Sequence, residues 1–175
     1  MTHRHHNRPS PYLLVCPFEH FPGRFGTHAH PFPQHISLVP EFECPTLGVE
    51  QELLGNLEYF CGQHEPFTVT LGAPRMYETD DPVLAQPIKL HRRKAASLHA
   101  GLVALVVGSG CTIIGDPFTV DVFSPNVTVG TSGERFPEHI PIEMRSVLPI
   151  ARFAKGYRAV GKTPLDGFCL GKKPR

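Results

Sequence analysis

Two short segments of the chain hold residues that could do proton-transfer chemistry on a phosphate. The first reads His-Ile-Ser-Leu from His35, and the second reads Asn-Val-Thr-Val from Asn126, so polar and apolar residues alternate in both. Because alternate side chains of a strand share a face, His35 and Ser37 are predicted to point one way and Ile36 into a core. Asn126 and Thr128 are predicted to share a face in the same manner. An imidazole and two hydroxyls around one small ligand suit a phosphate.

These segments resemble the paired His-x-Thr/Ser-x motifs of the 2H phosphoesterase superfamily, which includes the 2′-5′ RNA ligase-like and cyclic nucleotide phosphodiesterase proteins. Residues 35–38 match the first motif in full, and residues 126–129 match the second except that Asn126 stands in place of histidine. The resemblance covers residues 10–165. It implies an α+β fold of two lobes, with mostly antiparallel sheets, flanking helices and a central cleft. It also implies metal-independent action on a 2′,3′-cyclic phosphate or a 2′-5′ phosphodiester of RNA or a nucleotide.

Hydrolysis of such a phosphodiester needs a base that takes a proton from water and an acid that protonates the departing oxygen. His35 can fill one of these roles, because imidazole titrates near neutral pH. Asn126 cannot fill the other, because its amide does not titrate there, but it can orient a water or a phosphate oxygen. The hydroxyls of Ser37 and Thr128 can donate to the non-bridging oxygens.

Three hypotheses follow from the missing second histidine. The protein is a slow phosphodiesterase that uses only His35, or it binds its ligand without turnover, or another residue replaces the histidine. His139 is the nearest such residue in the sequence. A protein with a purely structural role on the same scaffold is the remaining class.

Other candidate sites are weaker. His28, His30 and His35 invite a metal hypothesis, but no carboxylate or cysteine stands at ligand spacing nearby, so we predict no metal and no cofactor. Residues 108–110 read Gly-Ser-Gly but follow a predicted helix, which does not fit a phosphate-binding loop. No cysteine has an evident histidine partner, which disfavours a cysteine hydrolase.

The composition limits the size and partners of the protein. A chain of 175 residues with 41% hydrophobic residues forms one domain or two lobes that share a core. The 17 basic and 16 acidic residues disfavour a long nucleic-acid track but allow a nucleotide or an RNA end. The five cysteines lack a CxxC pair, and residues 1–10 do not resemble a signal peptide. We therefore expect a cytoplasmic monomer without membrane association.

Periodicity predicts the helices. Residues 47–63 and 97–107 have helical spacing of apolar residues, and Ser97 and Gly108 are the predicted ends of the second helix. The predicted domain spans residues 12–165, between a flexible tail at 1–11 and a basic tail at 166–175.

Alternation and β-branched residues predict the strands. Pro40 is expected to end the motif strand at residue 39, and Pro87 indicates an edge strand. Pro149 is unfavourable inside the strand predicted at 143–153, one of the two strands predicted at the end of the domain. A turn is expected at 76–81. The predicted strands are 12–16, 34–39, 67–71, 83–90, 126–130, 143–153 and 157–160.

Three further groups of residues have either a binding or a structural interpretation. The basic residues 92–94 either form a solvated turn or steer phosphate. Tyr157 and Phe42 either stack on a base or belong to the core. A second basic group lies among the closing strands, with Arg152, Lys155, Arg158 and Lys162 as its members.

Overall fold

The computed structural model describes residues 11–17, 35–77, 83–114, 126–128, 141–153 and 156–165. Side chains are described throughout these ranges except at residues 77, 83, 126–128, 153, 156 and 157. The predicted tails at 1–11 and 166–175 fall almost wholly outside these ranges.

The largest sheet is antiparallel and contains the first motif. Its strands lie in the order β10-β9-β1-β2-β6, and β11 pairs with β9. In chain order these strands are β1 Tyr12–Pro17, β2 His35–Glu43, β6 Thr112–Ile113, β9 Ser146–Phe153, β10 Gly156–Ala159 and β11 Thr163–Pro164.

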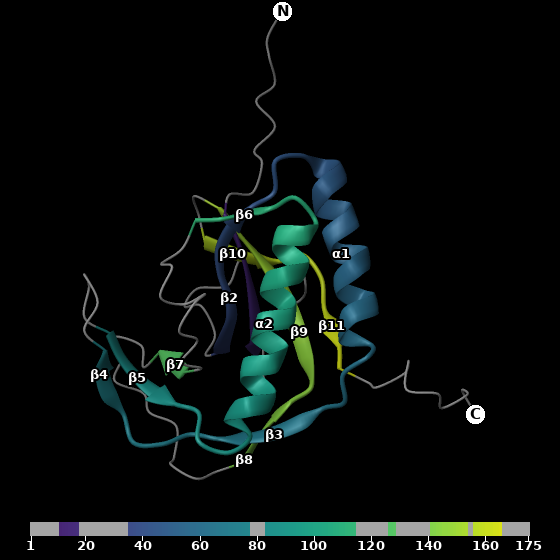
Figure 1. Ribbon diagram of the computed structural model, residues 1–175. Helices are drawn as coiled ribbons and strands as arrows, with labels where there is room; N and C mark the ends of the chain where they lie inside the picture. Colours follow the sequence, from purple (N-terminus) through teal and green to yellow (C-terminus); the bar gives the residue numbers. More distant parts are fainter. Residues whose placement is uncertain are drawn as a thin grey trace, which may run out of the picture.

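Two helices cover one face of this sheet (Figure 1). The first, α1, spans Leu47–Cys61, close to its predicted range. It begins at a capping residue, because Val49 N donates to Thr46 Oγ1 at 3.2 Å. Its buried residues Leu53, Leu57 and Cys61 recur every four positions, so one side of the helix faces the core.

The second helix, α2, spans Arg92–Gly108, so the predicted start at Ser97 is wrong. His91 precedes it in a left-handed conformation, with φ of 54°, and its side chain makes no capping hydrogen bond. The buried residues of α2 begin at Ala95, before Ser97. Burial of this longer stripe, rather than a capping side chain, therefore decides where the helix begins.

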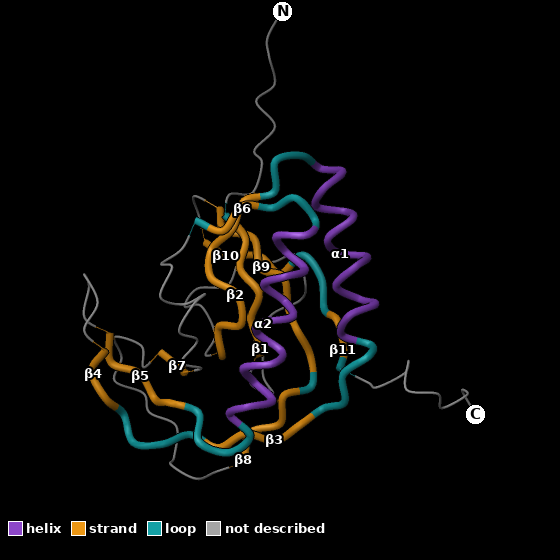
Figure 2. Tube along the Cα trace, in the orientation of Figure 1, coloured by secondary structure: helices purple, strands orange, loops and turns teal. Residues whose placement is uncertain are grey.

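The remaining strands form two smaller antiparallel sheets, which lie at the lower end of the main sheet in Figure 2. An isolated bridge between Leu71 and Ile88 connects them. One sheet pairs β3 Phe67–Thr70 with β8 Pro141–Met144, and the other has the order β4-β5-β7, with β4 Arg75–Tyr77, β5 Val83–Pro87 and β7 Asn126–Thr128.

Two predictions for this region are wrong. Residues 75–77 form a strand where a turn was expected at 76–81, and β5 is the central strand of its sheet rather than an edge strand. Pro87 is tolerated because it is the last residue of β5, and its carbonyl accepts a hydrogen bond from Gly72 N at 2.8 Å. The next residue, Ile88, bridges to Leu71 and so continues the contact between the two small sheets.

Two prolines lie inside strands of the main sheet. Pro40 does not end β2, because it falls at a register irregularity between the pairs Tyr12–Phe42 and Leu14–Val39. Pro149 lies within β9, at the point where pairing changes from β10 to β11. Proline lacks an N–H donor, so it fits a strand only where the ladder is interrupted in this way.

The core of the described residues has two clusters on opposite faces of the main sheet. The larger cluster joins the sheet to both helices, and the smaller contains Val15, Leu148, Ile150 and Ala159. Among the described residues, no helix is long and apolar enough to cross a membrane.

Candidate functional site

The first motif lies at the start of β2, and its side chains alternate as predicted. Ile36 and Leu38 are 0% and 1% exposed and belong to the core between the sheet and the helices. His35 is half-buried, and Ser37 is exposed. The predicted separation of polar and apolar faces is therefore confirmed for this copy.

The register of β1 shows which face holds the polar pair. His35 lies opposite Pro17, and Ser37 lies opposite Val15. Directly paired residues of antiparallel strands share a face. Val15 belongs to the small cluster, on the face away from α1 and α2, whereas its neighbour Cys16 packs on the helix side. His35 and Ser37 therefore lie on the face that the helices leave open.

The second motif lies in the other sheet, in β7. Asn126 is paired with Pro87, and Thr128 is paired with Ala85, so positions 126 and 128 share one face of β7. For residues 126–128 of the second motif, the structure describes the backbone but not the side chains. Cα atoms of β7 come within 8 Å of Cα atoms of β2. The structure thus brings the two motif strands side by side, although they belong to different sheets.

A cation shares a row with the second motif. Arg75 in β4 is paired with Ala85, which is paired in turn with Thr128. The three positions therefore lie on one face of this sheet, and Arg75 is exposed. Arg75 and Thr128, at the two ends of this row, are two strand spacings apart, which is about 10 Å. An arginine in this place can reach toward an anion held near position 128.

A bulge in β2 lies at the last residue of the first motif. Val15 pairs with Ser37 and Leu14 pairs with Val39, so Leu38 is an extra residue on β2. Leu38 and Val39 are both buried in the helix-side core. The bulge lets two consecutive residues face the helices, and it sets the position of the motif residues before it.

His99 of α2 binds the extra residue of this bulge. Its Nδ1 lies 2.5 Å from the carbonyl oxygen of Leu38, and its side chain is buried. A carbonyl oxygen only accepts, so Nδ1 donates the hydrogen. Sequence reasoning missed His99. The available signal was its place in the apolar stripe of α2, which consists of Ala95, Leu98, His99, Leu102 and Val106.

The predicted basic group near the closing strands is partly neutralised. Arg152 Nη1 lies 2.9 Å from Glu41 Oε1. Arg152 lies two positions after Ile150, a member of the small cluster, and residues two positions apart in a strand share a face. This ion pair therefore lies on the same sheet face as Ser37. Arg158 and Lys162 lie on or after β10, the strand at the opposite edge of the sheet from β6.

The other candidate residues divide into those in the core and those outside the described ranges. Phe42 is fully buried and stacks on Tyr12, with ring centroids 5.8 Å apart, so its core interpretation holds and base stacking is excluded. No group of histidine, cysteine and acidic residues within the described ranges could hold a metal ion. Besides Asn126 and Thr128 of the second motif, five predicted residues fall where no side chain is described, namely His28, His30, His139, Lys155 and Tyr157.

Comparison with solved structures identifies the fold. A structure described as a phosphoesterase is 18% identical, with a TM-score of 0.58 over 91% of this chain and 99% of that chain. E. coli LigT in complex with 3′-AMP is 18% identical, with a TM-score of 0.59 over 90% and 99%. This chain has the fold of the 2H phosphoesterases. TT0787 of Thermus thermophilus agrees, with 16% identity and a TM-score of 0.60 over 89% and 97%.

The predicted α+β fold of the 2H phosphoesterases is therefore confirmed over nearly the whole chain. No family model and no curated protein matches the sequence. The likeness is thus one of structure, and the chemistry depends on the residues that this chain has at the two motif strands.

Proposed function

We propose that the protein is a phosphoesterase that acts on a 2′,3′-cyclic phosphate or a 2′-5′ phosphodiester of RNA or a nucleotide. The observation on which this depends is the approach of β2 and β7, which carry the two motifs from different sheets. His35 and Ser37 on the open face of β2 support it. The proposed ligand is a small nucleotide or an RNA end, bound by a cytoplasmic monomer without a metal.

In this proposal a water attacks phosphorus, and the bond from phosphorus to one ribose oxygen breaks. His35 transfers one of the two protons, either from the attacking water or to the departing oxygen, and solvent water exchanges the other. The hydroxyls of Ser37 and Thr128 donate to the non-bridging oxygens, where negative charge increases in the transition state. Asn126 orients the water or a phosphate oxygen, because its amide donates and accepts hydrogen bonds but does not titrate.

The rate expected for such a site is low. A general acid or base contributes about 10²–10⁴-fold to the rate of a reaction, and Asn126 supplies neither. The alternative function is therefore a protein that binds nucleotides or RNA ends without turnover. LigT structures are described with 3′-AMP and with ATP, which makes these two nucleotides the first ligands to test on this chain.

The test compares wild type, His35→Ala and Asn126→His for hydrolysis of 2′,3′-cyclic nucleotides and of a 2′-5′ linked dinucleotide. Products are separated by chromatography and assigned by phosphorus NMR. We expect slow turnover by wild type, its loss in His35→Ala, and an increase of about 10²-fold or more in Asn126→His. Ligand binding by calorimetry is measured on all three proteins.

Each outcome distinguishes the functions. Activity that appears only in Asn126→His, with nucleotide binding by wild type, supports the binding protein. Equal turnover by wild type and His35→Ala would overturn the proposed role of His35. Neither turnover nor binding by any of the three proteins would refute both functions and leave the fold alone.

A further inference from the structure

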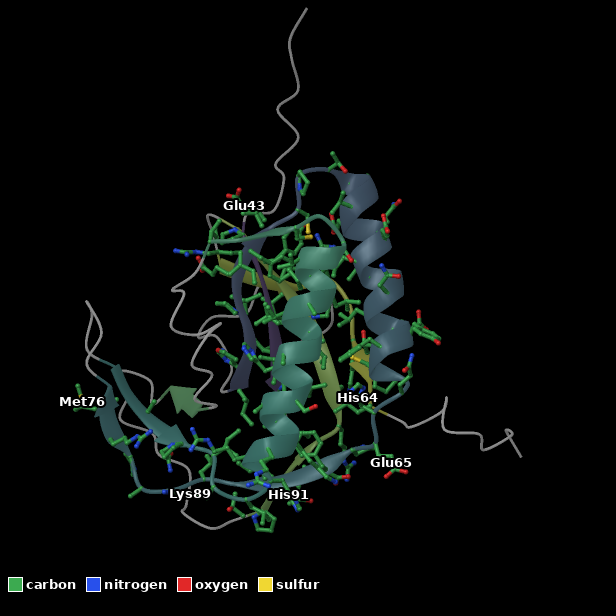
Figure 3. The ribbon with its side chains drawn as sticks, in the orientation of Figure 1. Glu43, His64, Glu65, Met76, Lys89 and His91 are labelled. Atoms are coloured by element: carbon green, nitrogen blue, oxygen red, sulfur yellow. The ribbon has the colours of Figure 1, made fainter. Side chains whose placement is uncertain are left out.

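The two cysteines at the far end of β2 lie in direct contact. Cys44 follows the last residue of β2, and Cys111 precedes the first residue of β6. Their Sγ atoms are 3.3 Å apart, although 67 positions separate them in the sequence. Cys44 is partly exposed, whereas Cys111 is 5% exposed. Glu43, the neighbour of Cys44, is labelled at this end of the sheet in Figure 3.

The strand register shows that this contact has the geometry of a cross-strand pair. Phe42 is paired with Ile113, and Glu43 is paired with Thr112, so the next pair in the same register is Cys44 with Cys111. Ile114 N donates to Glu41 O at 2.8 Å, which continues the same register on the other side.

Hydrogen-bonded and non-hydrogen-bonded pairs alternate along an antiparallel ladder. The Glu41–Ile114 pair is hydrogen-bonded, so the Cys44–Cys111 pair, three steps along, falls at a non-hydrogen-bonded position. Cα atoms of such pairs are about 4.5 Å apart, which is within the range that a disulfide spans. The backbone therefore holds these two sulfur atoms where a bond can form with little movement.

We propose that Cys44 and Cys111 are a disulfide-forming site, which a small-molecule disulfide such as oxidised glutathione closes. The Cys44 thiolate attacks the small disulfide, forms a mixed disulfide and releases one thiolate of the oxidant. The Cys111 thiolate then attacks the Cys44 sulfur and releases the second. Two protein thiols are oxidised to one disulfide, and the two released thiolates take up the two protons that the protein thiols lose, so the oxidant is reduced to two thiols. Cys44 reacts first because it is the more exposed of the two.

The surroundings of the pair make the reaction slow near neutral pH. Burial raises the pKa of both thiols, and the contact with Cys111 and the charge of Glu50 raise the pKa of Cys44 further. The thiolate is the nucleophile, so a raised pKa means that little of it is present at neutral pH. The pair therefore stays reduced until the pH or the oxidant concentration increases.

The bond would join two segments that are distant in the sequence. It would tie the end of the strand that holds the first motif to the chain that leaves α2. Closing a loop of this length restricts the unfolded chain strongly, so we expect the melting temperature to increase by roughly 5–10 °C. This inference does not depend on the proposed phosphoesterase activity.

The test uses the full chain, reduced and then incubated with oxidised glutathione at mildly alkaline pH. Remaining thiols are alkylated under denaturing conditions, and the linkage is assigned by mass spectrometry of proteolytic peptides. We expect a peptide pair joined through Cys44 and Cys111, lighter than the two free peptides by two hydrogen atoms. The pair is expected to persist in Cys16→Ala, the matched control, because Cys16 is a buried cysteine elsewhere in the sheet.

The wild-type peptide map decides the proposal without any variant that alters folding. Cys44→Ser and Cys111→Ser must each abolish the linked pair. Alkylation of both Cys44 and Cys111 in wild type after oxidation would overturn the proposal. Linkage of either cysteine to a different cysteine, in place of the Cys44–Cys111 bond, would overturn it as well.

Discussion

The imidazole of His99 donates to the carbonyl oxygen of Leu38, the residue that the bulge adds to β2. This contact joins the middle of α2 to the strand that holds His35 and Ser37. A bulge changes the register of a strand by one residue and so changes which residues share a face. By satisfying the Leu38 carbonyl, His99 stabilises the register that separates the polar from the apolar residues of the motif.

Removing this donor is expected to destabilise the protein. His99→Leu leaves the Leu38 carbonyl buried without its donor, which costs about 1–3 kcal/mol of the free energy of unfolding. His99→Asn keeps an N–H group near the place of Nδ1, so it serves as the matched variant and should be the more stable of the two. Urea denaturation of the three proteins measures this order. A His99→Leu protein as stable as wild type would contradict the role of the contact.

The two faces of β2 predict effects of different size on stability for substitutions at neighbouring residues. Leu38→Ala removes a fully buried side chain and should lower the free energy of unfolding by about 2–5 kcal/mol. Ser37→Ala changes an exposed residue and should alter stability by less than about 0.5 kcal/mol.

The same Ser37→Ala change is expected to lower turnover by about 10²–10³-fold, as the loss of one donor to the transition state does. The Asn126→His background provides the activity for this comparison. Thermal unfolding and turnover are measured on the same preparations. If Ser37→Ala lost stability but kept its turnover, the assignment of the open face as the ligand face would be wrong.

Arg75 is expected to contribute to nucleotide affinity, because it shares a row with position 128. Arg75→Gln should weaken binding of 3′-AMP about tenfold, which corresponds to a charge-assisted hydrogen bond of about 1.5 kcal/mol. Arg145→Gln is the control, since Arg145 is exposed and paired with Glu143. Calorimetry at two salt concentrations measures both variants. Equal affinities of the two variants would exclude Arg75 from the site.

The first turn of α2 opposes the helix dipole. It contains three basic residues at 92–94 and no acidic residue. Cations near the amino end of a helix are unfavourable, so Lys94→Glu should raise the free energy of unfolding by about 0.3–1 kcal/mol. Lys94→Gln only removes the positive charge, so its free energy of unfolding should lie between those of wild type and Lys94→Glu. Urea denaturation at low salt measures the series, and a decrease in stability for Lys94→Glu would instead show that Lys94 makes a stabilising contact.

Buried thiols predict a loss of stability at alkaline pH. Burial raises the pKa of Cys16 from its ordinary value of 9.0 to about 12. Between these values the unfolded chain loses the Cys16 proton while the folded chain keeps it. Stability is therefore full below pH 9 and decreases as the pH rises, by about 1.4 kcal/mol per pH unit for this thiol. Burial and a hydrogen bond to Glu50 raise the pKa of Tyr12 as well, with the same sign.

Cys16→Ala isolates the contribution of one thiol. Its free energy of unfolding should decrease less steeply with pH than that of wild type, although its value at neutral pH is lower because a buried atom is lost. Denaturant unfolding in the presence of a reductant, at several alkaline pH values, gives both slopes. Identical slopes would mean that Cys16 titrates alike in the folded and unfolded chains.

Much of the local structure could be predicted from single segments of the sequence. The alternation at residues 35–38 predicted which side chains of that segment are buried, and the periodicity of residues 47–63 predicted α1, which spans Leu47–Cys61. The predictions failed where contacts between distant segments decide the extent of a strand or the start of a helix. Pro40 and Pro149 lie inside strands because the ladder is interrupted there, and Ser97 is not a helix start because the buried stripe begins before it.

The sequence by itself determined the residue types of the two motifs, the absence of a second motif histidine, and the apolar faces that must be buried. Only the tertiary structure decided that β7 lies beside β2, that Arg75 shares a row with Thr128, and that His99 binds the bulge. The physical reason is the range of the interactions. Alternation and helical periodicity are properties of neighbouring residues, whereas strand register and contacts across the core depend on which distant segments pack together.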